Sequence, residues 1–254
     1  MSARAQVAEA FDFVEEYAAA AERFATAVEE TDLRSTVPAC PDWTGYDVVA
    51  HLGNVHAWAA TVVETGRSAA PSDDRPPSRK SRAARDWYAG KAEDLYQVLR
   101  AADPDSPCWN FAYGAGVAGF WPRRQLHETL MHLVDLDQTA GRTTLLSPSI
   151  AADGVGEVLT VFLHRMHSRG NPADLRAPLS LVSTDTGHTW LLDPRPDGPP
   201  AVAVRATPAE DRLEAPAEVL LRLLWGRASI DDPAVALYGE VDHLRAFLAS
   251  RLTP

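Results

Sequence analysis

The chain has 254 residues, enough for one large domain or two of ordinary size, and 46% of them are apolar. Its 35 acidic and 24 basic residues give a net charge of -11, which disfavours contact with nucleic-acid phosphates. No apolar run approaches the roughly 20 residues that span a bilayer, and the acidic N-terminus lacks the apolar segment of a signal peptide. With only Cys40 and Cys108, the sequence predicts a cytoplasmic protein without a disulfide framework.

Four helices are predicted in the first part of the chain. Apolar residues at three- and four-residue spacing predict a helix over residues 4–31. After a loop at 32–41, Thr44 and Asp47 approach a capping box at the start of a second helix, which ends near Gly66. A polar, Pro-rich loop at 67–80 precedes a third helix over 81–102. An irregular segment follows at 103–121, and Pro122 suits the first turn of a fourth helix that runs to Ala140, with Gly141 as its C-cap. This pattern predicts a helical bundle.

The pattern changes at about residue 150. Ser147-Pro148 begins another helix that runs to about residue 167. Two strands over 179–183 and 189–192 flank a hairpin turn at 185–187, and a third strand is predicted over 201–206. Helices follow near 216–226 and 241–251. The sequence therefore predicts an α+β fold, with a four-helix bundle over residues 1–145 and a smaller α+β domain over residues 150–254.

A candidate metal site lies on the fourth predicted helix. Glu128 and His132 are four residues apart, so their side chains share one face and can reach one ion. Carboxylate and imidazole groups are both zinc ligands. His51 is the natural third ligand, because it lies within the second predicted helix among apolar neighbours. Three protein ligands leave one position open, as in catalytic sites. Without an ion, Glu128 and His132 would be a hydrogen-bonded pair at the edge of the core.

Other histidines offer alternatives. His127 could pair with His51 as a ligand instead, although it has no partner four residues away. His56 lies on a different helix face from His51, and we expect it to be a surface or capping histidine. His164 and His167 have the spacing of a metal-binding pair, but solvated helix residues are the expected interpretation.

Three stretches resemble a known family. Residues 37–53, VPACPDWTGYDVVAHLG, resemble the N-terminal signature of the mycothiol-dependent maleylpyruvate isomerase family. Residues 123–135, RRQLHETLMHLVD, followed by Ala140-Gly141, resemble its fourth-helix signature, and residues 224–227 loosely resemble its C-terminal domain. The resemblance implies a DinB-like four-helix bundle that holds zinc or another divalent metal on His51, Glu128 and His132.

The resemblance also implies a low-molecular-weight thiol at the open metal position, which is mycothiol, bacillithiol or glutathione in different members. A free thiol has a pKa of about 8.5, and coordination to zinc deprotonates it. In the isomerase, the thiolate adds to the cis-alkene of maleylpyruvate, the new single bond rotates, and elimination gives fumarylpyruvate. An S-transferase would instead consume the thiol in attacking a small electrophile. The alternative is a metal-binding or stress-response protein without turnover.

A substrate with carboxylates would need cations near the metal. Arg123 and Arg124 lie one turn before the ligand pair, where positive charge opposes the helix dipole, although both could be solvated charges. Arg222 and Arg227 are candidates from the C-terminal region, and the Gly-Arg sequence favours Arg227. We take Arg227 and Arg123 as the candidate catalytic residues.

Two further side chains lie near the candidate ligands in the sequence. Asp135 follows His132 by three residues and could orient its imidazole, or could serve in packing or capping. Trp43 is expected to anchor the preceding loop to the bundle rather than to stack on the substrate.

Overall fold

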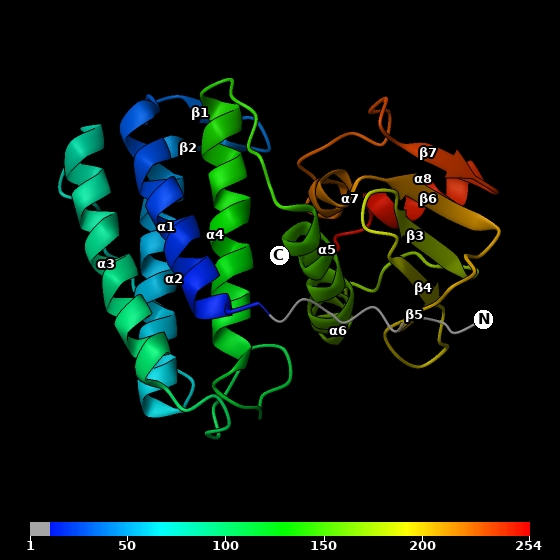
Figure 1. Ribbon diagram of the computed structural model, residues 1–254, viewed down its shortest axis with the longest axis horizontal. Coiled ribbons are helices and arrows are strands. Elements are labelled where there is room, and N and C mark those ends of the chain that lie inside the picture. Colours follow the sequence, from blue (N-terminus) through cyan, green and yellow to red (C-terminus); the bar gives the residue numbers. More distant parts are fainter. Residues whose placement is uncertain (1–10) are drawn as a thin grey trace.

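The N-terminal part of the protein is a four-helix bundle. The computed structural model describes residues 11–254. Helices α1 and α2 each pack against both α3 and α4 (Figure 1). The predicted bundle is confirmed, although residues 4–10 of the first predicted helix lie outside the described part. The bounds are α1 Phe13–Glu30, α2 Gly45–Thr65, α3 Ser81–Ala101 and α4 Phe120–Thr139.

Helix α2 has well-defined ends. The backbone N–H of Thr44 donates to the carboxylate of Asp47 at 3.0 Å, which is one half of the predicted capping box. Gly66 ends the helix with a φ of 67°, a left-handed conformation that favours glycine. Strand β1 (Thr36–Val37) pairs with β2 (Cys40–Thr44) just before the helix, where the sequence predicted only a loop. These features fix the position of the second helix turn, which carries His51.

The C-terminal part is built around a mixed sheet with the order β5-β4-β3-β6-β7. Strand β3 pairs parallel with β6, and the other pairs are antiparallel. A continuous helical segment precedes the sheet, in which a π-helical turn, η1, joins α5 to α6. The bounds are α5 Pro148–Glu157, η1 Val158–Phe162, α6 Leu163–Ser168, β3 Leu179–Ser183, β4 Thr189–Asp193, β5 Ala201–Val204, β6 Asp211–Ala215, α7 Ala217–Leu224, β7 Ala236–Tyr238 and α8 Val241–Ala249.

Two strands of this sheet were not predicted from the sequence. Strand β6 reads DRLEA, and its charged residues hide the alternation that marks a half-buried strand. Strand β7 has only three residues, too few for a period to be recognised. The hairpin of β3 and β4 and the flanking helices are close to their predicted positions, so the α+β fold class is confirmed.

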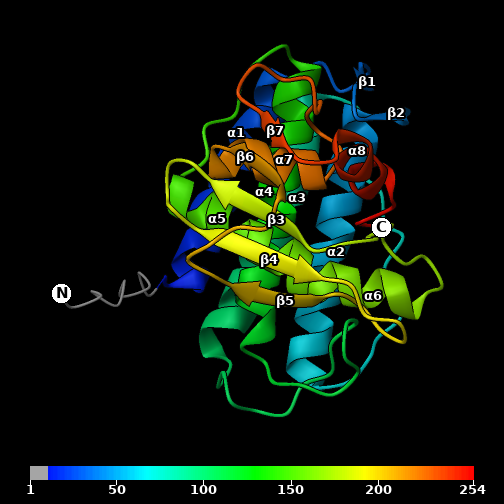
Figure 2. The ribbon, with the colours of Figure 1, turned by 90° about the vertical axis from the view of Figure 1, so that its right-hand side faces the viewer.

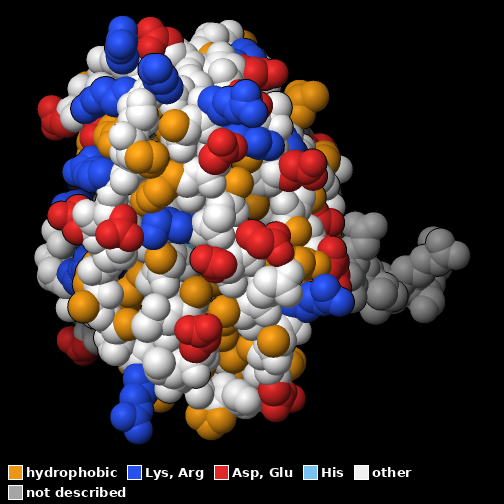
Figure 3. Space-filling model, turned by 90° about the vertical axis from the view of Figure 1, so that its left-hand side faces the viewer, with side chains coloured by type: hydrophobic (Ala, Val, Ile, Leu, Met, Phe, Trp, Pro, Cys, Tyr) orange, Lys and Arg blue, Asp and Glu red, His pale blue; other side chains and the backbone are white. Residues whose placement is uncertain are grey.

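The helices α5, α6 and α7 lie between the bundle and the sheet (Figures 1 and 2). Buried apolar side chains form one continuous core from the bundle into the sheet region. The division at residues 145–150 therefore stays a prediction. On the opposite face of the bundle, acidic and basic side chains lie side by side (Figure 3). None of the helices in residues 11–254 has the length and apolar character needed to cross a membrane.

Candidate metal centre

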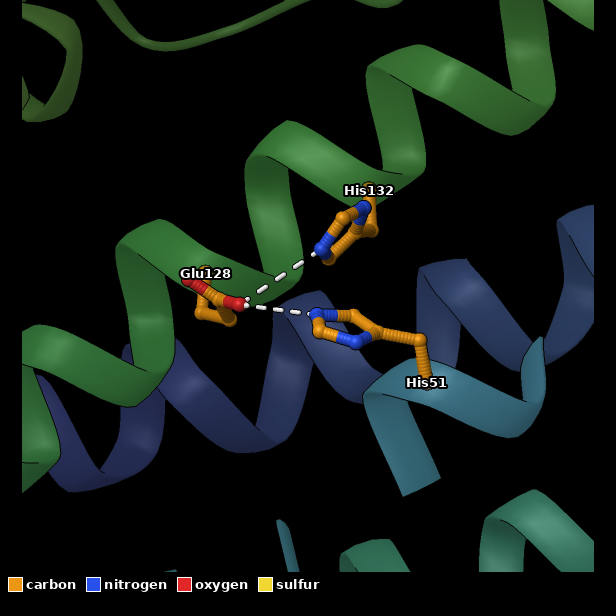
Figure 4. Close-up of side chains that lie close together, drawn as sticks. All are labelled: His51, Glu128 and His132. Atoms are coloured by element: carbon orange, nitrogen blue, oxygen red, sulfur yellow. Dashed lines mark ion pairs between the residues drawn. The ribbon is translucent and has the colours of Figure 1, made fainter. Parts of the chain in front are cut away.

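Three predicted ligands converge between α2 and α4. Oε1 of Glu128 lies 3.4 Å from Nε2 of His51 and 3.5 Å from Nε2 of His132 (Figure 4). One donor atom from each side chain lies within 4.8 Å of the others. The i, i+4 spacing on α4 and the mid-helix position of His51 thus meet at one point, as the sequence predicted.

The donor set fits a small divalent cation. Ligands about 2.0–2.2 Å from a tetrahedral zinc are separated by about 3.3–3.5 Å, and both Glu128–His distances lie in this range. The His51 and His132 rings meet edge to face, with centroids 4.9 Å apart. His51 keeps 38% of its side-chain surface exposed, whereas His132 keeps 10%. The open side of the set therefore lies at His51.

The charges at the site favour a cation between the ligands. Burial would raise the pKa of Glu128, but the guanidinium of Arg124 and hydrogen bonds to both histidines hold it well below its usual range. Burial would lower the pKa of His132, yet hydrogen bonds to Asp135 and Glu128 raise it to about 9. The position between these carboxylates thus attracts positive charge, which either a proton or a metal ion can supply.

Arg124 connects Glu128 to the C-terminal part of the chain. Its Nη2 donates to Oε2 of Glu128 at 2.8 Å, and its Nη1 pairs with Glu157 of α5. Arg124 and Glu157 are only 2% and 1% exposed. The alternative that Arg124 is a solvated charge is therefore wrong. Arg124 thus holds Oε2 of Glu128, while Oε1 faces the two histidines.

Asp135 and Arg227 orient the second α4 ligand. Oδ2 of Asp135 lies 2.9 Å from Nδ1 of His132, which leaves Nε2 facing the other ligands. Arg227 donates to both oxygens of Asp135, at 3.0 and 3.1 Å. Arg227 thus reaches the site from the C-terminal part of the chain, as predicted, but it contacts Asp135, which orients His132, and not a candidate ligand.

A cavity of about 570 Å³ opens beside His51. Its wall combines α2 with Trp43, whose ring centroid is 5.0 Å from that of His51, and with residues 71–75. Asn54 and Asp74 fasten this Pro-rich segment to α2 through hydrogen bonds of 2.9 and 3.2 Å. A ligand that occupies the cavity would therefore contact both Trp43 and the open side of the donor set.

Arg123, the other predicted catalytic residue, does not join the ligand set. Its Nε donates to Asp153 of α5 at 2.8 Å, and its Nη2 donates to the carbonyl of the same residue. The alternative ligand His127 turns to the same carboxylate, with 2.7 Å between Nε2 and Oδ2. Both side chains therefore join α4 to α5, away from His51.

The remaining candidates lie elsewhere. Arg222 pairs with Glu218 at 3.1 Å on its own helix. His164 and His167 are partly exposed on α6 and are absent from the one cluster of possible metal ligands in the described chain.

His56 is completely buried, so its assignment as a surface residue is wrong. Its ring nitrogens lie 2.8 Å from Oε1 of Gln125 and 3.2 Å from the hydroxyl of Tyr88. Burial lowers the pKa of His56 to about 4, and the neutral ring joins α2, α3 and α4 inside the bundle.

Two charged residues near the site were missed by the sequence reasoning. Glu157, the buried partner of Arg124, follows a run of small and apolar residues and carries no motif. Arg165 of α6 lines the cavity beside His51. A buried carboxylate opposite a buried arginine is a tertiary feature, because the two residues are 33 positions apart.

Comparison with known proteins finds similarity to one family model and to solved structures. The model of the family described as mycothiol maleylpyruvate isomerase N-terminal domain matches residues 14–137. A crystal structure of a mycothiol-dependent maleylpyruvate isomerase superposes with a TM-score of 0.63 at 14% identity, covering 89% of this chain and 91% of that one. A structure of a histidine-to-alanine mutant of such an isomerase gives 0.62 at 12% identity with the same coverage. None of the curated proteins compared with the chain matches it.

At such identities the structural likeness establishes the fold, while the family match covers the helices that carry all three candidate ligands. The chain thus combines a DinB-like helical bundle with an α+β C-terminal part, its fold is that of a mycothiol-dependent maleylpyruvate isomerase, and its bundle matches the N-terminal domain model of that family over residues 14–137.

Proposed function

We propose that the protein is a metal-dependent enzyme that uses a low-molecular-weight thiol, mycothiol or a similar one, to isomerise a small activated alkene of the maleylpyruvate type. The convergence of His51, Glu128 and His132 beside an open cavity carries this proposal. We propose zinc as the ion, because two imidazoles and one carboxylate are a common catalytic zinc set with a position left open. The family match supports the choice of thiol and reaction.

Such an ion, when bound, would make a coordinated thiol available as the thiolate at neutral pH. The chain's own residues prepare the site for this. Arg124 holds Glu128 ionised and aimed at the histidines. Asp135 accepts the Nδ1 proton of His132, which keeps Nε2 free to act as a donor to the metal. Trp43 lies against the imidazole of His51, with the ring centroids 5.0 Å apart.

Metal content and thiol binding test the proposal together. Protein purified without a His-tag should contain about one equivalent of divalent metal, and the spectrum of the cobalt-substituted form should change when mycothiol is added. His51→Ala should lower the metal content below about a tenth of an equivalent. An unchanged metal content in this variant would refute the metal–thiol site, and so would a cobalt spectrum that does not change when mycothiol is added.

Turnover tests the reaction itself. The metal-loaded protein with mycothiol should convert maleylpyruvate to fumarylpyruvate, and a chelator should abolish the conversion. An isomerase returns the thiol, so the free-thiol concentration should stay constant through many turnovers. Stoichiometric loss of thiol would instead identify an S-transferase, and a panel of epoxides and enones would then identify its electrophile.

A further inference from the structure

The arginines that the sequence selected as cations for a substrate already have carboxylate partners. Each one lies within ion-pair distance of an acidic side chain in the structure. The pairs are Arg123 with Asp153, Arg124 with Glu128 and Glu157, Arg222 with Glu218, and Arg227 with Asp135. Arg124 and Arg227 support the candidate ligands, whereas Arg123 and Arg222 form pairs away from them, and in each case binding a substrate carboxylate would require breaking a pair.

Arg165 is different. It lines the cavity beside His51, and its guanidinium forms no ion pair with any residue between 11 and 254. Its Nε is shielded from solvent yet has no hydrogen-bond partner. The other arginine at the cavity, Arg75, is 57% exposed and pairs with Asp47 at 3.2 Å. Arg165 is therefore the cavity cation that still lacks an anion.

The surroundings of Arg165 make this charge unusual. Burial and the nearby charge of Arg169 lower the pKa of Arg165 to about 10, while Glu128 opposes the shift and Arg124 adds to it. The group stays protonated at neutral pH, although burial and the neighbouring arginines disfavour its charge. An anionic ligand would offset this cost and could accept a hydrogen bond from the buried Nε.

The backbone and an aromatic platform hold Arg165 in place. The π-helical turn Val158–Phe162 adds about one residue to the helix, which rotates α6 by roughly 100° relative to an uninterrupted α-helix. The hydroxyl of Tyr113 donates to the carbonyl of Thr160 within this turn at 2.8 Å. The guanidinium lies over the ring of Phe111, 4.2 Å from its centroid. Such π turns are frequent at functional sites.

We propose that Arg165 binds a carboxylate of the electrophilic substrate and is the residue that selects for anionic electrophiles at this site. The inference rests on the proposed thiol-dependent function. A guanidinium can hold a carboxylate through two parallel hydrogen bonds, which fixes its orientation as well as its position. In a cis-enedioic acid the carboxylate is attached to the alkene, so fixing it at Arg165 also keeps the alkene within the cavity that His51 lines.

A pair of substrates with and without charge tests this role. Maleylpyruvate and diethyl maleate are both cis-alkenes activated by carbonyl groups, but only the first carries carboxylates. With metal-loaded protein and mycothiol, Arg165→Met should raise KM for maleylpyruvate about tenfold to a hundredfold, as expected for a lost charge-assisted pair, and change diethyl maleate less than about twofold. Arg165→Lys should recover part of the affinity, since it keeps the charge and loses the fork.

Arg195→Met is the control, because it removes the same charge from an exposed residue that does not line the cavity. It should leave both substrates within about twofold of wild type. Thermal unfolding of each variant establishes that the fold is retained. Equal losses on the charged and uncharged substrates after Arg165→Met would overturn the inference while leaving the proposed function intact.

A binding measurement tests the role of Arg165 even if the proposed function is wrong. Trp43 and Trp58 line the cavity, so titration with maleate, followed by tryptophan fluorescence, reports occupancy without turnover. Metal-free wild type should bind maleate at least about tenfold more tightly than metal-free Arg165→Met. If wild type turns over neither substrate, the proposed function fails and this difference still decides the role of Arg165. Equal maleate affinities would overturn that role.

Discussion

Replacing Asp135 by asparagine should weaken metal binding and destabilise the metal-free protein at the same time. Asp135 is 1% exposed and makes three polar contacts, one to His132 and two to Arg227. An amide has nearly the same shape, but one of its ends is a donor. Whichever way it turns, an N–H₂ group faces a donor, either the imidazole of His132 or the guanidinium of Arg227.

The structure sets the expected sizes of the two effects. Breaking a buried ion pair typically costs about 3–5 kcal/mol. Arg227 is 12% exposed and keeps a hydrogen bond to the carbonyl of Trp225, so we expect about 3 kcal/mol, the lower end. The loss of a carboxylate that orients a ligand imidazole weakens metal binding about 10- to 100-fold. For Asp135→Asn we therefore expect a clear loss in both quantities.

Asp137→Asn provides the control. Asp137 lies on the same helix and pairs with Arg142 at 2.9 Å and with Thr144 at 2.8 Å, but it contacts no candidate ligand. Urea unfolding of the metal-free proteins gives the stability change, and competition with a chromogenic chelator gives the metal affinity. Asp137→Asn should lower stability by about 1–2 kcal/mol and leave metal affinity within about twofold. Equal effects of both variants on metal affinity would refute the orienting role of Asp135.

Three further predictions concern the same region. His132→Ala should abolish stoichiometric zinc, measured by elemental analysis, whereas Gln138→Ala on the same helix should retain it. Arg124→Met should lower metal affinity by about tenfold in chelator competition, because it removes the cation that holds Glu128 ionised; an unchanged affinity would show that the histidines suffice. His56 should make the metal-free protein acid-sensitive. The pKa of His56 is about 4 in the folded protein and 6.5 in the unfolded chain, so the neutral ring stabilises the fold fully above pH 6.5. About 3 kcal/mol of this stability is lost as the pH falls to 4. In urea unfolding, the difference in the free energy of unfolding between wild type and His56→Asn should therefore become smaller over the same pH range.

The sequence pattern that predicted the two candidate ligands on α4 was local. The spacing of Glu128 and His132 places two donors on one helix face whatever surrounds the helix, because the α-helical period determines it. Thr44 and Gly66 likewise mark the ends of α2 through interactions within a few residues. Helix periodicity alone gave the wrong environment for His56, because contacts with α3 and α4 bury this residue.

The roles of the arginines depended on distant parts of the chain. Arg123 and Arg124 are adjacent in sequence, yet one turns to Asp153 and the other to Glu128, since neighbouring helix positions point about 100° apart. Arg165 carries no motif, and its place at the cavity depends on a π turn and on Phe111 from another segment. No periodicity in the sequence reports which arginine finds a carboxylate partner.

The sequence by itself determined the bundle and the α+β class, because helix periodicity and capping residues are local properties. The i, i+4 spacing, which is also local, identified Glu128 and His132 as candidate ligands, while His51 was identified from its mid-helix position and from the family resemblance. Only the tertiary structure decided how those ligands are supported and which side is open. Glu128 is held by a buried Arg124–Glu157 pair, and His132 by Asp135 and a guanidinium 92 residues further along the chain. Such contacts arise from packing between elements, where burial removes water as a competing partner and makes each remaining charge dependent on its neighbours.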